Sequence, residues 1–243
     1  MSVRIALWLQ RTLSRLISPL WIPLCVLVMT YIFRWKIEGV KSSRAEYSRL
    51  RKASVPVLIC ANHLTKLDSA LIGWALGGMT FYLRDFGAVA WNLPAREHFA
   101  YSWWARIAVY LLKCIPIDRG GSRKGIAQVL SKLTWLMNRG EAGLVFPEGG
   151  RSRTGRVDVQ SAAYGVGRIV RALPGCRVLC VYIRGRSQDS WSDLPKRGES
   201  FFVAVRSFEP KSDKGGLRAS VDIAEQVMMH LSEMESRYFD DHA

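Results

Sequence analysis

A histidine and an aspartate five positions apart, His63 and Asp68, are the residues of this sequence best suited to chemistry. A histidine acts as a general base when a carboxylate fixes its tautomer and stabilises the imidazolium that forms as it takes a proton. Residues five apart on one continuous helix lie about 140° apart around its axis, so a hydrogen bond between the two side chains requires a break. The pair therefore predicts a general base, with His63 in a loop and Asp68 in the first turn of a helix.

A second block with chemical potential follows about eighty residues later, at residues 146–152, with the sequence F-P-E-G-G-R-S. It combines a glycine-rich turn at Gly149 with one carboxylate, Glu148, and one guanidinium, Arg151. Such a set suits an anionic substrate that carries a hydroxyl group, because a guanidinium forms strong, oriented hydrogen bonds to anions. Between the two blocks, Arg119 follows a short expected strand and would emerge at the same edge of a sheet.

The N-H-x4-D and F-P-E-G-x-R-S blocks together resemble those of the glycerolipid acyltransferase family, whose bacterial members include 1-acylglycerol-3-phosphate acyltransferase. The resemblance covers roughly residues 55–185. It implies transfer of a fatty acyl group from acyl-coenzyme A or acyl carrier protein to the free hydroxyl of lysophosphatidic acid, which forms phosphatidic acid in phospholipid synthesis. It implies no cofactor and no metal. The residues that it makes catalytic are His63 and Asp68, and those that it places in substrate binding are Arg119, Glu148, Gly149 and Arg151.

Two departures from the family pattern leave the acceptor open. Gly150 stands where the family usually has threonine, and Cys180 stands where an apolar strand usually contains proline. The alternatives are another lipid acceptor, such as a lyso-aminolipid, a lysophospholipid or a polyene pigment lipid, or a catalytically silent membrane-binding module. The intact pair of His63 and Asp68 favours an enzyme over the silent module.

Other kinds of site have weaker support in this sequence. Cys60 lies three residues before His63, but the chain has no second Cys/His pair at metal-ligand spacing, which argues against zinc. Ser122 lies in the sequence G-G-S-R-K, which lacks the last glycine of the G-x-S-x-G nucleophile elbow. We expect Ser122 to be a helix N-cap.

The pattern of apolar residues around these blocks alternates between strand and helix. Residues 54–61 predict a buried strand and residues 67–76 a helix, so that His63 lies at the carboxyl end of a strand, where ligands bind in open α/β sheets. Further helices are expected at residues 100–113, 122–139 and 159–170 and from a Ser220 cap onward, and further strands at residues 80–90, 114–117, 142–146, 177–184 and 201–208. The fold class is therefore α/β, a single domain with a mixed, largely parallel central sheet flanked by helices.

The N-terminal segment predicts contact with a membrane. Residues 16–33 contain no charge, and as a helix they would extend about 27 Å, against a hydrocarbon core of about 30 Å. Pro19 and Pro23 interrupt this stretch and basic residues flank it on both sides, which makes a re-entrant or interfacial helical hairpin at least as plausible as a span. We therefore divide the chain into a membrane-anchoring helical segment, residues 1–41, and a catalytic domain, residues 42–243.

Charge and cysteine content agree with a membrane enzyme. The formal net charge is +15, which favours anionic lipid, nucleic acid or an acidic protein as partner. Nucleic acid is not expected, because no zinc finger, RNP-type aromatic run or basic region leading into heptads is present. Five cysteines without framework spacing indicate a reducing compartment, hence the cytoplasmic face of the inner membrane. A basic cluster that could touch anionic headgroups comprises Arg44, Arg49, Arg51 and Lys52.

Overall fold

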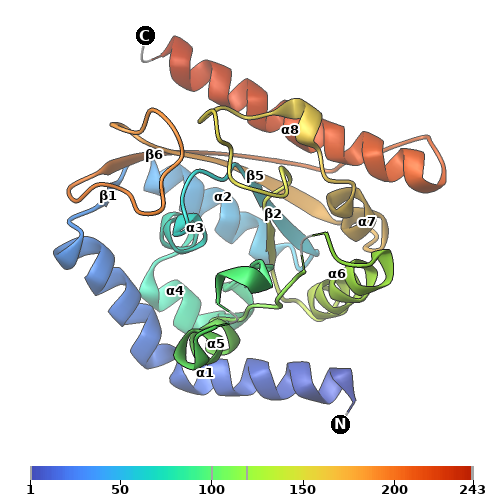
Figure 1. The fold of residues 1–243 in the computed structure, drawn as a ribbon, viewed down its shortest axis with the longest axis horizontal. Coiled ribbons are helices and arrows are strands. Elements are labelled where there is room, and N and C mark those ends of the chain that lie inside the picture. Colours follow the sequence, from blue (N-terminus) through green and yellow to red (C-terminus); the bar gives the residue numbers. More distant parts are fainter. Residues whose placement is uncertain (1, 100, 119, 242–243) are drawn as a thin grey trace.

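Six strands form one sheet in the order β1-β6-β5-β2-β4-β3 in the computed structural model, which describes residues 2–99, 101–118 and 120–241 (Figure 1). The strands are β1 (Lys36–Ile37), β2 (Val57–Ala61), β3 (Trp91–Asn92), β4 (Gly143–Val145), β5 (Arg177–Gly185) and β6 (Ser200–Phe208). All neighbouring strands pair in parallel except β5 and β6, which are antiparallel. The predicted α/β fold with a mixed, largely parallel sheet is confirmed.

Eight α-helices within the described residues surround the sheet. They are α1 (Val3–Leu27), α2 (Val40–Lys52), α3 (Asp68–Leu76), α4 (Met79–Arg84), α5 (Trp103–Leu111), α6 (Arg123–Met137), α7 (Gly165–Arg171) and α8 (Gly216–Asp240). A π-helical segment, η1 (Val28–Ile32), continues α1, and three short 3-10 helices are η2 (Phe86–Ala88), η3 (Arg96–His98) and η4 (Val159–Ser161).

Four secondary-structure predictions were wrong, and one of them is the single helix expected at residues 159–170, which is divided between η4 and α7. Residues 80–90 form α4 and η2 rather than a strand, because Tyr82 turns inward and its hydroxyl donates to the Gly73 carbonyl of α3 at 2.6 Å. Residues 114–117 make only isolated bridges to the chain around β3. Ser220 is not a cap, since α8 begins four residues earlier and Ser220 is buried within it.

Successive side chains of the central strands point to opposite faces of the sheet, and this divides the hydrophobic core into two layers. Leu58 and Cys60 of β2 point to one face of the sheet, where α6, α7 and α8 pack. Val57 and Ile59 point to the other face, which α2, α3, α4 and the end of α1 cover. Both faces of β2 and β5 are thus buried, as is usual for parallel strands with helices on both sides. The carboxyl end of β2 lies between these layers. It is followed by residues 62–67, the histidine loop, which contains His63.

The N-terminal helix α1 lies along the outside of the domain and turns the polar side chains of Gln10, Ser14 and Ser18 inward. Gln10 donates from Nε2 to the carbonyls of Tyr110 and Cys114, both at 2.9 Å, and the Ser14 hydroxyl donates to the Leu111 carbonyl. Figure 1 shows that α1 bends as it passes around the lower edge of the molecule. The helix contains Pro19 and Pro23, each of which removes a backbone donor and kinks a helix.

This helix is one continuous element rather than the hairpin that the prolines suggested. By length and composition alone, α1 together with η1 could cross a membrane, and no other helix within the described residues passes that test. Its outward face carries exposed leucines, of which Leu16 and Leu20 are 70% and 75% exposed.

The basic cluster on α2 is largely engaged with the protein itself. Arg51 forms an ion pair with Asp85 and donates to the Gly140 carbonyl, and Arg49 pairs with Glu46. Arg44 donates to the Trp74 carbonyl at 3.0 Å. Contact of this cluster with anionic headgroups stays a prediction, and three of its four cations have partners within the protein.

Candidate functional site

The histidine loop joins β2 to α3 and brings His63 against Asp68. Asp68 is the first residue of α3, as predicted, and His63 lies in the loop just after the strand. His63 Nδ1 lies 2.9 Å from Asp68 Oδ2. The histidine side chain is 12% exposed and the aspartate 3%. The ring is therefore reachable from solvent at one edge, while its carboxylate partner is covered.

Hydrogen bonds to Asp68 fix the orientation of the imidazole. Its Oδ2 also accepts the backbone N–H groups of Leu64 at 2.6 Å and Thr65 at 2.8 Å, and its Oδ1 accepts the Thr65 hydroxyl at 2.6 Å. An ionised carboxylate only accepts hydrogen bonds, so His63 Nδ1 carries the proton. Nε2 of the neutral ring then presents a lone pair and can take a proton from a substrate.

An aromatic ring from the second block packs on the imidazole. Phe146, the residue after β4, stacks on His63 with ring centroids 4.0 Å apart and an interplanar angle of 15°. The N–H of Ser152 donates to the His63 carbonyl at 2.9 Å. The two sequence blocks, far apart along the chain, therefore form a single site.

The turn between Phe146 and Ser152 depends on a glycine. Gly149 has a φ of +70°, a left-handed conformation that favours glycine, and its N–H donates to the Phe146 carbonyl at 3.0 Å. Behind this site, Asn62 joins two strands, since its side chain exchanges hydrogen bonds with the backbone of Ile183 at 2.8 and 2.9 Å. The turn and Asn62 hold both loops at the same edge of the sheet.

Glu148 contributes a carboxyl group with an unusual environment. Its Oε1 is buried and has no hydrogen-bond partner within the described part of the chain. Burial raises the pKa of Glu148 to about 7, although the backbone N–H groups of His63 and Asp158 act in the opposite direction. This group can accept or donate a hydrogen bond near neutral pH.

Arg151 lies beside the histidine loop, held by a loop from elsewhere in the chain. Its Nη1 donates to Asp193 Oδ1 at 2.5 Å, and its guanidinium lies 4.8 Å from the centre of the Trp191 ring. Arg119, predicted to bind substrate with it, lies outside the described residues.

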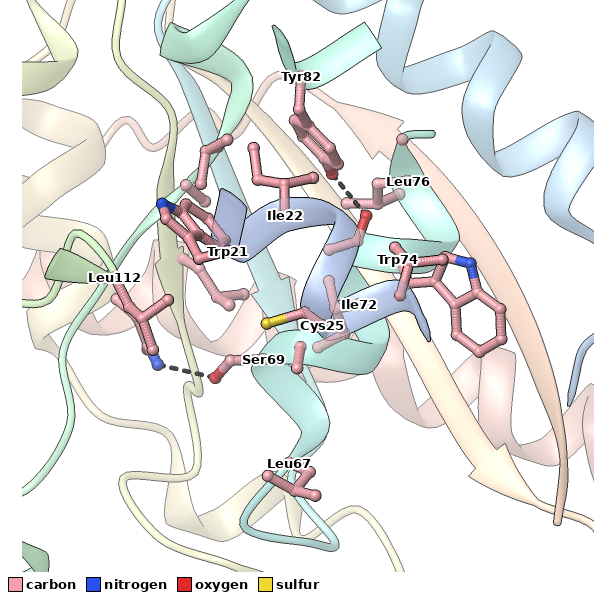
Figure 2. A pocket seen from close by; sticks show the side chains of 18 of the residues that line it. Trp21, Ile22, Cys25, Leu67, Ser69, Ile72, Trp74, Leu76, Tyr82 and Leu112 are labelled. Carbon is pink, nitrogen blue, oxygen red and sulfur yellow. Dashed lines mark hydrogen bonds between the residues drawn. The ribbon is translucent and has the colours of Figure 1, made fainter. Parts of the chain in front are cut away.

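Two apolar cavities flank the site. One, of about 280 Å³, lies between α1, α3 and α4, and Figure 2 shows Trp21, Ile22 and Cys25 of α1 meeting side chains of α3 in it. Leu67 and Ser69, on either side of Asp68, line the same cavity. The other, of about 330 Å³, lies beyond β4 and is lined by Phe146 and Gly149 together with residues of α6 and α7.

The rival sites gain no support from the geometry. Cys60 is fully buried, and burial raises the pKa of its thiol well above the usual value, which disfavours the thiolate that acts as metal ligand or nucleophile. Ser122 caps α6 by accepting the Gly125 N–H at 3.1 Å, as expected. Within residues 2–99, 101–118 and 120–241, no group of three or more His, Cys, Asp or Glu side chains is placed to hold a metal ion.

Several residues of the site were not predicted from the sequence. Phe146 and Asn62 stand inside the motifs, and their position next to chemical residues was the signal that could have assigned them a role. Trp191 and Asp193 had no such signal, because they lie in the loop between β5 and β6, about 130 residues after His63 along the chain.

Comparison with known proteins identifies the family of this chain. A family model described as "Acyltransferase" matches residues 39–184, more than half of the chain, and this range contains both sequence blocks. No curated protein matches the chain.

Proposed function

Because the chain belongs to the acyltransferase family, we propose that it transfers a fatty acyl group from acyl-coenzyme A or acyl carrier protein to the free hydroxyl of lysophosphatidic acid. The observation that carries this proposal is the hydrogen bond between His63 and Asp68, with Nε2 of the histidine left as the acceptor. A base of this kind activates a hydroxyl and needs no metal or covalent enzyme intermediate to do so.

The proposed reaction depends on the proton at His63 Nδ1, which leaves Nε2 free to accept a second proton. His63 Nε2 removes the hydroxyl proton of the acceptor as its oxygen attacks the thioester carbonyl carbon. The tetrahedral intermediate collapses by breaking the carbon–sulfur bond, and the thiolate that leaves takes the proton back from His63. Asp68 stabilises the transient imidazolium through its hydrogen bond to Nδ1–H.

Groups of the second block bind the acceptor in this proposal. Arg151, and Arg119 with it, would bind the phosphate, since guanidinium groups pair well with phosphate oxygens. Glu148 would position the hydroxyl of the acceptor or a guanidinium, and the Gly149 turn leaves space for the backbone to approach the substrate. The buried, unpartnered Oε1 of Glu148 supports this assignment.

The cavity beside α3 provides space for an acyl chain. Its walls are mostly apolar, and residues on either side of Asp68 line it, so a chain in this cavity would place a thioester near the base. The outer wall is α1, whose other face carries exposed leucines, so the chain could enter from a lipid phase.

Membrane association completes the proposal. Residues 1–41 would act as an interfacial anchor for the catalytic domain of residues 42–243, because α1 is tied along its length to the domain and presents Leu13, Leu16 and Leu20 outward. The neighbouring helix α5 adds Trp103 and Trp104, which are 74% and 65% exposed. Exposed apolar surface of this kind marks membrane or protein contact. The absence of disulfides among the five cysteines accords with the cytoplasmic face of the membrane.

The proposal is tested by thiol release from acyl-coenzyme A in the presence of lysophosphatidic acid. His63→Ala should lose roughly 10²- to 10⁴-fold in kcat, because the general base is gone, and Asp68→Asn should also be severe. His230→Ala is a matched control, since His230 lies on α8, where its Nδ1 is 3.9 Å from Glu233. Full turnover by folded His63→Ala would contradict the mechanism, and a wild-type protein without turnover on any lipid hydroxyl would favour the silent membrane module.

A further inference from the structure

The loop between β5 and β6 touches the histidine loop at several points. The N–H of Ser192 donates to the Leu64 carbonyl at 3.0 Å, and the N–H of Lys66 donates to the Asp193 carbonyl at 3.3 Å. These backbone bonds fix Asp193 next to the segment that carries His63 and Asp68.

The side chain of Asp193 bridges two cations at this place. Its Oδ2 accepts from Lys66 Nζ at 2.7 Å and its Oδ1 accepts from Arg151 Nη1 at 2.5 Å. Lys66 lies between His63 and Asp68 in the chain, and Arg151 precedes Ser152, whose N–H is bonded to the His63 carbonyl. Both cations are therefore held close to the catalytic base from two different loops.

Arg151 is oriented before any ligand binds. The ring of Trp191 supports its guanidinium at 4.8 Å, within the range of a cation–π contact. Its side chain is 21% exposed, whereas those of Lys66 and Asp193 are 49% and 60% exposed. Because exposed ion pairs in water are weak, the carboxylate of Asp193 can be displaced.

We propose that Lys66 and Arg151 form a phosphate-binding site that Asp193 occupies in the unliganded protein. A phosphate monoester carries up to two negative charges and three acceptor oxygens, so it satisfies both cations better than one carboxylate does. Lys66 is thus a binding residue. Asp193 competes with the phosphate for both cations and lowers the affinity of the site for it. This inference rests on the proposed function, in which the phosphate belongs to the lysophosphatidic acid acceptor.

Kinetics with two acceptors test the assignment. The full-length protein is assayed with lysophosphatidic acid and with the monoacylglycerol of the same chain, which lacks the phosphate. Asp193→Asn should lower the KM for lysophosphatidic acid roughly two- to fivefold, the range of an exposed ion pair, and raise the ratio of kcat/KM between the two acceptors by the same factor. Lys66→Met should raise that KM about tenfold, as expected for loss of a charge-assisted hydrogen bond.

A matched control variant distinguishes this site from a general effect of charge in the loop. Asp189→Asn removes a negative charge from the same loop and keeps the backbone carbonyl of Asp189, which accepts a hydrogen bond from Arg184. This variant should behave as wild type. A higher KM for lysophosphatidic acid in Asp193→Asn would show that Asp193 merely positions Arg151, and would overturn the proposal. So would changes confined to the KM of acyl-coenzyme A, which would assign the site to a donor phosphate.

A binding measurement distinguishes failure of this site from failure of the proposed function. Calorimetric titration with glycerol 3-phosphate at constant ionic strength requires no turnover. Tighter binding by Asp193→Asn and weaker binding by Lys66→Met would support the site even if wild type does not acylate lysophosphatidic acid. Equal affinities in wild type, Asp193→Asn and Lys66→Met would overturn it even if the acylation occurs.

Discussion

The imidazole of His63 is held from three directions. Asp68 binds its Nδ1, Phe146 covers one face of the ring, and Ser152 binds the backbone carbonyl behind it. A base that is fixed before the substrate arrives loses little entropy during the reaction. In the proposed reaction, the aromatic residue at the start of the second block would therefore help to orient the base supplied by the first.

Glu148 should make stability depend on pH. Its pKa is raised from 4.5 to about 7 in the folded protein, so between these values the folded state keeps a proton that the unfolded state releases. Stability from this group is therefore greatest at low pH and falls as pH rises through that window. Glu148→Gln, which cannot ionise, should gain about 1–3 kcal/mol relative to wild type between pH 4.5 and pH 7.

Urea unfolding of both proteins across this pH range measures the effect. Glu225→Gln, on the exposed face of α8, is the control and should follow wild type. A constant difference between Glu148→Gln and wild type at every pH would show that the folded protein does not hold this carboxyl group protonated.

At the scale of elements, a buried ion network attaches α1 to the sheet. Glu141, just before β4, binds Lys113 Nζ at 2.5 Å and Arg11 Nε of α1 at 2.5 Å, and it accepts the indole N–H of Trp91 at 3.0 Å. Lys113 and Glu141 are 0% and 2% exposed. Burial lowers the pKa of Lys113 to about 8, while Glu141 opposes that change.

Removing one partner of this network should lower the free energy of unfolding, because it leaves a buried charge without an ion-pair partner. Glu141→Gln should lose about 3–5 kcal/mol of unfolding free energy, measured by urea denaturation, and tryptic cleavage at Arg11 should become faster. Glu233→Gln breaks the exposed pair with Arg206 and should lose less than about 1 kcal/mol. Equal losses in the two variants would argue against a network that holds α1.

The cavity between α1 and α3 should set the length of the acyl chain. Gly73 lines it, and a Cβ added there would meet no atom within 4 Å. Gly73→Leu should fill the space and shift preference to shorter chains, with about 0.8 kcal/mol lost for each displaced methylene, or about fourfold in kcat/KM. Assays with a series of saturated acyl-coenzyme A donors measure this, and Gly73→Ala is the control. An unchanged chain-length profile in Gly73→Leu would place the chain elsewhere.

For the whole molecule, the leucine face of α1 should dominate membrane binding. The variant Leu16→Glu with Leu20→Glu should reduce the vesicle-bound fraction at least about tenfold, because burial of each leucine contributes roughly 1.5–3 kcal/mol. Sedimentation with phosphatidylglycerol vesicles measures it. The +15 charge should make binding weaken as salt is raised.

The control for this experiment is Leu217→Glu on α8. Leu217 is 65% exposed, and Figure 1 places α8 on the opposite side of the sheet from α1. Equal loss of binding in both variants would mean that general charge repulsion, rather than the face of α1, controls attachment.

The sequence by itself determined the features that depend on neighbouring residues. A break between His63 and Asp68, the strand before it and the helix after it all follow from spacing and apolar periodicity, and the structure confirms them. The alternation of strands and helices likewise predicted the α/β sheet. The short segments at residues 80–90 and 114–117 were wrongly predicted to be strands. Their local preference for strand is weak, and packing against α3 and β3 overrides it.

Only the tertiary structure decided which distant residues meet. The ring of Phe146 on His63, the carboxylate of Asp193 between Lys66 and Arg151, and the inward polar contacts of α1 join segments between 42 and about 130 residues apart. The apolar stretch at residues 16–33 did not reveal which side chains of its helix contact the domain, since that depends on the packing of distant residues around positions 110–114. The contacts near His63 depend on how the loops close at the carboxyl edge of the sheet, and those of α1 depend on where the helix packs against the domain. Both are set by the packing of the whole core rather than by any local pattern.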